Sequence, residues 1–166
     1  MKTAASAQAK TAIIFASKKG ATEKCANILV EKIDNDAKLI NLKTEKNPEI
    51  DGFDAVIIGG PIYMGTLDKR VTKFVERNKA ALLSKKLGLY ICCMEDGEVR
   101  MQQFESAYDE ELRNHAVAHG QFGGAFDFKK MNFIVRSMIR MAAKVKESTE
   151  NFDYTNIDTF VAAFTK

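Results

Sequence analysis

The chain is poor in the residues that mark fibrous, disulfide-stapled or membrane-embedded proteins. Its 166 residues include only 2 Pro and 10 Gly, which excludes a collagen-like or low-complexity sequence. No apolar run approaches the roughly 20 residues that a membrane-spanning helix needs. The stretch from Met1 to Lys10 has no apolar centre, so we expect no secretory signal peptide there. With 46% hydrophobic and 28% charged residues, the composition is that of a folded globular domain.

Cysteine is also scarce, and its placement indicates a reducing compartment. The 3 cysteines are Cys25, Cys92 and Cys93. An odd count with two adjacent members does not form a disulfide framework. We therefore expect reduced, mostly buried thiols in a cytoplasmic protein. Packing is the expected role of Cys92 and Cys93, and the alternative is that one of them lies beside a bound ring.

The chain lacks a large net charge. Its formal charge is 25 − 22 = +3, which is too small to require a nucleic-acid partner. The distribution is uneven, because residues 129–146 carry six basic side chains and no acidic one. This basic segment is expected to form a helix that packs on a sheet with a solvated charged face. The alternative is that the same face meets an anionic substrate or anionic lipid head groups, each basic residue contributing ~1 kcal/mol.

Five apolar runs predict the buried strands of a mainly parallel sheet, and five other stretches have helical spacing. The predicted strands are 12–16, 38–42, 55–59, 87–93 and 121–126, and the predicted helices are 22–34, 68–83, 103–115, 131–147 and 155–164. Strands that alternate with helices predict an α/β fold with helices on both faces of the sheet. No linker or repeat interrupts the pattern, so we expect one domain over residues 10–166 after a loose tail, residues 1–9.

The loop after the first strand suits a phosphate. It reads Ser17, Lys18, Lys19, Gly20, Ala21, Thr22 and joins a strand to the start of a helix. Free backbone N–H groups and the helix dipole favour an anion there, and the hydroxyls and lysines add donors and positive charge. The alternative is an ordinary turn with Thr22 as a helix cap and solvated lysines.

Three familiar phosphate-handling patterns are absent. The loop is neither G-x-x-x-x-G-K-[ST] nor G-x-G-x-x-G, which argues against a nucleotide-hydrolysing P-loop and a dinucleotide site. The predicted ends of strands one and three are Ala16-Ser17 and Gly59-Gly60. A phosphoacceptor receiver domain needs acidic residues at these ends.

Two further loops complete a predicted binding edge. Residues 60–67 are expected to form a loop in which Pro61, Ile62, Tyr63, Met64 and Gly65 supply an aromatic and a thioether wall for a flat ring. The loop after the fourth strand contains Met94, Glu95, Asp96 and Gly97. Its acidic groups would lower the reduction potential of a bound redox-active ring, or they form a solvated turn. We predict no metal site, because a strand is expected to begin between His115 and His119, and no set of catalytic side chains.

These residues, taken in order, resemble the flavodoxin-like family that binds FMN. The stretch 15–23 resembles its phosphate loop. The stretch 53–65 is similar to its ring loop in the branch of menaquinone-dependent protoporphyrinogen IX dehydrogenases. Gly124-Ala125-Phe126, the basic Met-rich segment 133–144 and Asp153-Tyr154-Thr155 follow the same branch. Lys18 and Lys19, the slightly basic charge and the long insert after the fifth strand depart from carrier flavodoxins and favour that branch.

The resemblance implies a three-layer sandwich, with a five-stranded parallel sheet of order 2-1-3-4-5 and FMN bound non-covalently. Ser17 to Thr22 would take the phosphate, Pro61 to Gly65 the isoalloxazine ring, and Met94 to Gly97 its other side. The implied activity passes electrons from a reduced organic substrate to FMN and on to a quinone or a redox partner protein, in the cytoplasm or at the inner face of the membrane. The alternatives are an electron carrier without its own substrate and a flavin-free interaction or sensing module.

Overall fold

The computed structural model describes residues 10–17, 20–33, 36–126 and 149–166, and the single positions 134, 137 and 141. The predicted tail, residues 1–9, lies outside the described residues. Apart from those three positions, so do the predicted helix 131–147 and the basic segment. Among the helices within these ranges, none combines the length and the apolar character that crossing a membrane requires.

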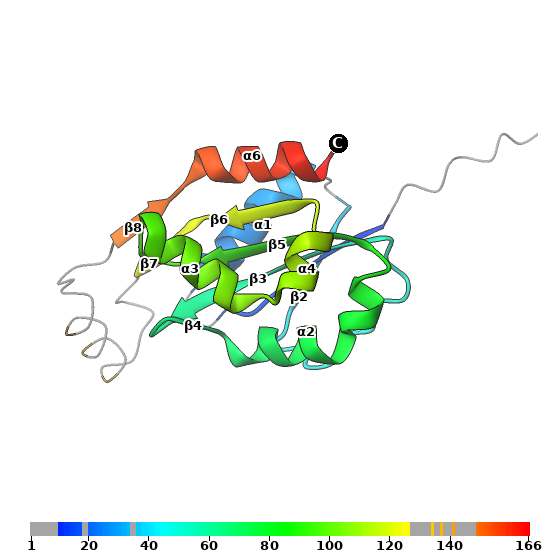
Figure 1. Ribbon diagram of the computed structural model, residues 1–166, viewed down its shortest axis with the longest axis horizontal. Coiled ribbons are helices and arrows are strands. Elements are labelled where there is room, and N and C mark those ends of the chain that lie inside the picture. Colours follow the sequence, from blue (N-terminus) through cyan, green and yellow to red (C-terminus); the bar gives the residue numbers. More distant parts are fainter. Residues whose placement is uncertain are drawn as a thin grey trace, which may run out of the picture.

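A parallel sheet forms the centre of the molecule (Figure 1). Its order is β2 (Lys38–Asn41), β1 (Thr11–Phe15), β3 (Ala55–Tyr63), β5 (Lys86–Cys92), β6 (Ala118–Gln121). Counting only these parallel strands, the order is the predicted 2-1-3-4-5. Every residue of β1 is buried, which explains why this strand is a continuous apolar run rather than an alternating one.

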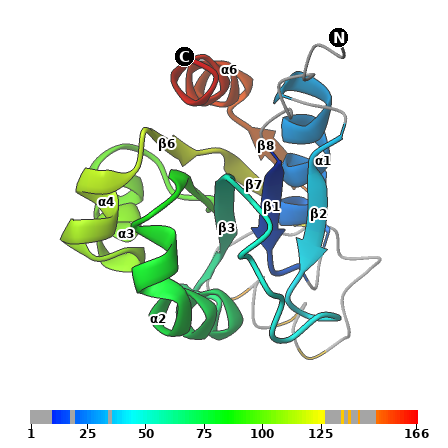
Figure 2. The same ribbon diagram turned by 90° about the vertical axis from the view of Figure 1, so that its right-hand side faces the viewer.

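Helices cover both faces of the sheet (Figure 2). One face carries α1 (Ala21–Ile33) and α6 (Tyr154–Phe164), and the other carries α2 (Lys69–Leu82), α3 (Gly97–Ala107) and α4 (Glu110–His115). Each face has its own apolar core: Leu29 and Phe160 belong to the first, Phe74 and Phe104 to the second. The predicted three-layer α/β sandwich is therefore confirmed.

The predicted loop over residues 60–67 is wrong, because the chain forms a hairpin there. β3 runs on to Tyr63 and returns as β4 (Thr66–Leu67), with Ile62 paired to Leu67 and Tyr63 to Thr66. The two turn residues, Met64 and Gly65, have φ values of 52° and 78°. Two successive left-handed residues form the tight turn whose twist matches that of the flanking strands.

The predicted fifth strand is also displaced. The sheet ends with β6, and residues 123–126 form β7 (Gly123–Phe126), which pairs antiparallel with β8 (Thr149–Phe152) in a separate two-stranded sheet. Gly123 has φ of 78°, and its missing Cβ would lie 1.9 Å from the carbonyl oxygen of Asn151. Only glycine allows this close approach, which turns the chain out of the main sheet.

The predicted helix 103–115 is two helices. α3 begins earlier, at Gly97, and ends before Tyr108, whose φ and ψ of −129° and 136° are extended. The carboxylate of Asp109 accepts a hydrogen bond from the backbone N–H of Leu112 and starts α4. This cap supplies the local reason for the break.

Candidate functional site

Three loops meet at the carboxyl edge of the sheet. They follow β1, β3 and β5, which are neighbouring strands with direct pairing between β1 and β3 and between β3 and β5. From β1 the chain moves to β2 on one side and then to β3 on the other. Ligands of open α/β sheets bind outside the carboxyl ends of the strands at such a reversal.

The first loop is tied together at Ser17, which is 7% exposed. Its backbone N–H donates to Oδ1 of Asn41 at 3.4 Å, and its Oγ accepts from the N–H of Gly20 at 3.0 Å. Gly20 has a left-handed φ of 89°, and α1 begins at the next residue, Ala21. A hydroxyl therefore lies beside the amino end of a thirteen-residue helix. The hydroxyl proton of Ser17 and the N–H groups of the first turn of α1 fit a phosphate group. Lys18 and Lys19 lie outside the described residues.

Thr22, the last residue of this predicted loop, faces the interior. It is 1% exposed, and its side chain hydrogen-bonds the thiol of Cys92 at the end of β5. Its binding role stays a prediction.

The hairpin after β3 carries the second group of predicted binding residues, Pro61 to Gly65. Pro61 is buried, Ile62 and Tyr63 are half-buried, and Met64 at the tip is 82% exposed. Burial, with a contribution from the charge of Asp68, raises the pKa of Tyr63 to about 12, so its phenol keeps its proton at neutral pH. Tyr63 also lines an open cavity of about 400 Å³, together with Thr66, Leu67, Asp68, Lys69 and Arg70.

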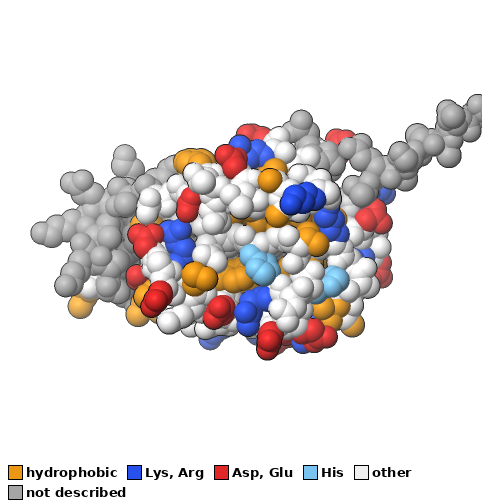
Figure 3. Space-filling view, turned by 45° about the horizontal axis from the view of Figure 1, so that its top comes forward, with side chains coloured by type: hydrophobic (Ala, Val, Ile, Leu, Met, Phe, Trp, Pro, Cys, Tyr) orange, Lys and Arg blue, Asp and Glu red, His pale blue; other side chains and the backbone are white. Residues whose placement is uncertain are grey.

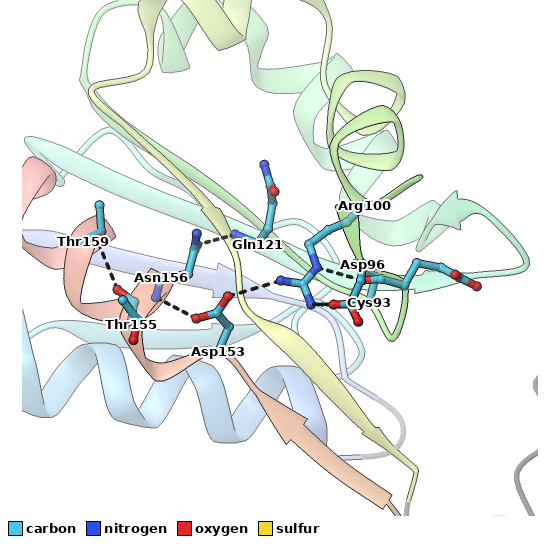
Figure 4. A network of polar contacts seen from close by, with 9 residues as sticks. Cys93, Asp96, Arg100, Gln121, Asp153, Thr155, Asn156 and Thr159 are labelled. Carbon is cyan, nitrogen blue, oxygen red and sulfur yellow. Dashed lines mark hydrogen bonds and ion pairs between the residues drawn. The ribbon is translucent and has the colours of Figure 1, made fainter. Parts of the chain in front are cut away.

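The third loop is held by Arg100, a residue of α3 that is only 12% exposed (Figure 4). Its Nε donates to the carbonyl oxygen of Glu95 at 2.7 Å, and its two terminal nitrogens reach Oδ1 of Asp96 at 2.6 Å and Oδ2 of Asp153 at 3.2 Å. Met94 is half-buried, while residues 95–97 are exposed. The guanidinium of Arg100 offsets the negative charge of Asp96, so the net negative charge of this loop is smaller than its sequence indicates.

Sequence reasoning missed Arg100 and its partner Asp153. Asp96 and Arg100 stand four residues apart around the start of α3, which is a readable ion-pair spacing on a helix. Asp153 is 53 residues further along and also caps α6 by accepting from the N–H of Asn156 at 2.9 Å. No local pattern indicates that contact.

The two histidines have separate structural partners. Nε2 of His115 donates to the carbonyl oxygen of Lys85, and Nε2 of His119 donates to that of Arg113, each at 2.7 Å. The two imidazoles occupy separate positions on one face of the molecule (Figure 3). Within the described ranges, no three His, Cys, Asp or Glu side chains gather as a metal site would require.

Burial of Cys93 makes the stability of the fold depend on pH in the alkaline range. Burial raises the pKa of its thiol from 9.0 to about 11. The unfolded chain therefore loses this proton first as the pH rises. The contribution of the protonated Cys93 thiol to the free energy of unfolding is complete below pH 9 and is lost as the pH approaches 11.

We expect urea unfolding to show a smaller fall in stability between pH 9 and 11 for Cys93→Ser than for the unchanged chain. Ser84→Ala changes an exposed residue and serves as the control with an unaltered pH profile. Equal pH slopes for Cys93→Ser and the unchanged chain would contradict the assignment.

Comparison with known proteins agrees with this architecture. A family model for the flavodoxin domain matches residues 12–153, which is most of the chain, so the protein belongs to the flavodoxin domain family. FMN, the cofactor predicted from the sequence, is the cofactor of this family. No curated protein matches the chain.

Several solved structures share the fold. Oxidised flavodoxin 1 from Bacillus cereus has 18% identity and a TM-score of 0.56, with 93% of this chain and 96% of that chain covered. A short-chain flavodoxin associated with a non-canonical PDU bacterial microcompartment has 15% identity and a TM-score of 0.54, with the same coverage of 93% and 96%. The Flv1 flavodiiron core from Synechocystis has 22% identity and a TM-score of 0.52 over 70% of this chain, which spans only 30% of that protein. These identities support the fold and no particular activity.

Proposed function

We propose that this chain binds FMN at the carboxyl edge of the sheet and works as a flavin-dependent oxidoreductase. The observation that carries the proposal is the placement of the Ser17 loop and the Tyr63 hairpin at the ends of two paired parallel strands, β1 and β3, where the strand order of the sheet reverses. One loop suits an anion and the other presents an aromatic and a thioether side chain. A phosphorylated ring compound needs both.

The chain's own residues would bind and orient the cofactor, and FMN would supply the transfer of electrons or hydride. Ser17 to Thr22 would hold the phosphate. Pro61 to Gly65 would hold the isoalloxazine ring. Met94 to Gly97, fixed by Arg100, would close the other side and limit the access of water.

For the substrate, we propose a reduced porphyrinogen, with a quinone or a redox partner protein as the acceptor. Support comes from the resemblance of residues 53–65 to protoporphyrinogen dehydrogenases and from the net charge of +3. The basic segment, residues 129–146, would attract the carboxylates of such a substrate or the anionic head groups at the inner face of the membrane.

Flavin binding is tested by the visible spectrum of the purified protein and by titration with FMN. We expect a yellow protein and a rise in its melting temperature when FMN is added. Ser17→Ala should weaken FMN binding about tenfold or more, because a hydrogen bond to a charged group is lost. Ser84→Ala, on the exposed surface, is the matched control. Absence of flavin absorbance and of any thermal shift would leave the flavin-free module as the function.

The activity is tested by turnover of a reduced porphyrinogen with a quinone as acceptor. Product formation that depends on FMN supports the enzyme. A chain that binds FMN and exchanges electrons with small reductants, yet never oxidises the porphyrinogen, is an electron carrier.

A further inference from the structure

Two cysteines that are distant in sequence meet under the phosphate loop. Cys25 of α1 and Cys92 of β5 are separated by 67 positions, and their Sγ atoms are 3.6 Å apart. The side chains are almost inaccessible, with 0% and 3% exposure. Cys93, the sequence neighbour of Cys92, belongs to the core on the opposite face of the sheet. The pair is therefore formed by packing, and the adjacent cysteines do not form one.

Hydroxyl groups surround this thiol pair although the core around it is apolar. The Thr22 side chain hydrogen-bonds Cys92. The hydroxyl of Tyr90, fully buried next to both cysteines, has no hydrogen-bond partner among the described residues. An unpaired buried hydroxyl lowers stability. A buried polar group without a partner is compatible with a redox role at this place in the fold.

Both cysteines stand near the ends of their secondary-structure elements, where local unfolding is easier. Cys25 is the fifth residue of α1, and Cys92 is the last residue of β5. Helix ends open more readily than the centre of a sheet. Opening of the first turns of α1 would therefore uncover Cys25 and remove its contact with Cys92.

We propose that Cys25 and Cys92 are a modification site that forms a reversible intrachain disulfide when the protein meets a peroxide. One thiolate attacks hydrogen peroxide, and the O–O bond breaks to leave a sulfenic acid. The departing hydroxide takes up the proton that the thiol had lost, which gives one water. The second thiol then attacks the sulfenic sulfur, the S–S bond forms, and a second water leaves. Two thiols are oxidised, one peroxide is reduced, and a dithiol reductant reverses the change.

Burial of the two thiols limits the rate of this oxidation. The hydrogen bond with Cys25 and the loss of solvent raise the pKa of Cys92 well above its ordinary value, so the closed protein holds an unreactive thiol. Oxidation must then follow the opening of α1. Since Thr22 bridges Cys92 and the phosphate loop, a ligand that holds this loop also holds the pair closed.

The experiment treats the flavin-free full chain with hydrogen peroxide, stops the reaction with catalase, unfolds the protein in urea with an alkylating reagent, and maps the peptides by mass spectrometry. We expect a peptide pair joined through Cys25 and Cys92, with Cys93 alkylated, and full reversal by dithiothreitol. Cys93→Ser should form the same bond, and Cys92→Ser should not. Three intact thiols, or oxidation confined to Cys93 in a folded protein, would overturn the proposal.

A second arm, which rests on the proposed function, repeats the reaction with FMN at about ten times its dissociation constant. Disulfide formation should slow about tenfold, because the ligand reduces the open population by that factor. If FMN fails to bind, the proposed function is lost while the disulfide result stands. If FMN binds and the rate is unchanged, the coupling to the phosphate loop is refuted.

Discussion

Replacing Gly59 by alanine is expected to destabilise the protein by about 3 kcal/mol. A Cβ at this position would lie 2.0 Å from the ring of Tyr90 on the paired strand. The ring has no room to move, because it stacks on Phe122 with centroids 4.8 Å apart and meets the edge of Phe160 at 6.3 Å. The strain must then spread into the backbone of β3 or β5. Urea unfolding measures the loss.

Two further variants make this prediction specific. Gly52→Ala adds the same atom where nothing lies within 4 Å, and its stability should stay within about 0.5 kcal/mol of the unchanged chain. Tyr90→Leu alone leaves a cavity and is costly, but combined with Gly59→Ala it should restore part of the loss, since the added methyl group then has space. If Gly59→Ala unfolds at the same urea concentration as Gly52→Ala, the packing of Tyr90 on Gly59 is refuted.

The central strands were predictable because burial on both faces leaves a continuous apolar signal. Residues 12–16 and 55–59 carry that signal, and both form strands. The last strand does not carry it: Ala118–Gln121 contains a histidine and a glycine and lies at the sheet edge. The fifth strand was predicted at residues 121–126 because this next stretch is more apolar. In the structure, Gly123 turns the chain away from the main sheet.

The hairpin at the binding edge shows a different limit. Pro61 and the nearby glycines are ordinary loop signals, yet Pro61 lies within β3 with Cys92 as its partner on β5. Met64, with φ of 52°, adopts a conformation that non-glycine residues seldom take. The pairing of Tyr63 with Thr66 decides the outcome, and that contact has no sequence pattern of its own.

The edge that carries the candidate site followed from topology, whereas the contacts within it did not. Alternating strands and helices place the loops after β1, β3 and β5 together whatever their side chains. The meeting of Cys25 with Cys92 and of Arg100 with Asp153 depends on how α1, α3 and α6 pack on the sheet. Such contacts join residues 67 and 53 positions apart, beyond the reach of local periodicity.

Replacing Arg100 by methionine should have the largest effect on the binding edge. The variant keeps an apolar stem but loses three charge-assisted hydrogen bonds, to Glu95, Asp96 and Asp153. Because both carboxylates are partly exposed and regain water, the loss of stability should be about 2 kcal/mol. Residues 94–97 then lose their tether to the start of α6, and FMN affinity should fall about tenfold.

Arg113→Met is the matched control for this change. Arg113 is also half-buried and donates to a backbone carbonyl, that of Tyr108 at 2.9 Å, but it lies on α4, outside the three loops of the binding edge. It should lower stability without changing the dissociation constant of FMN. Removal of the Arg100 cation should also make the reduction potential of bound FMN more negative, since an adjacent positive charge favours the added electron. Unchanged affinity and potential in Arg100→Met would show that the guanidinium stabilises the fold and has no part in holding the cofactor.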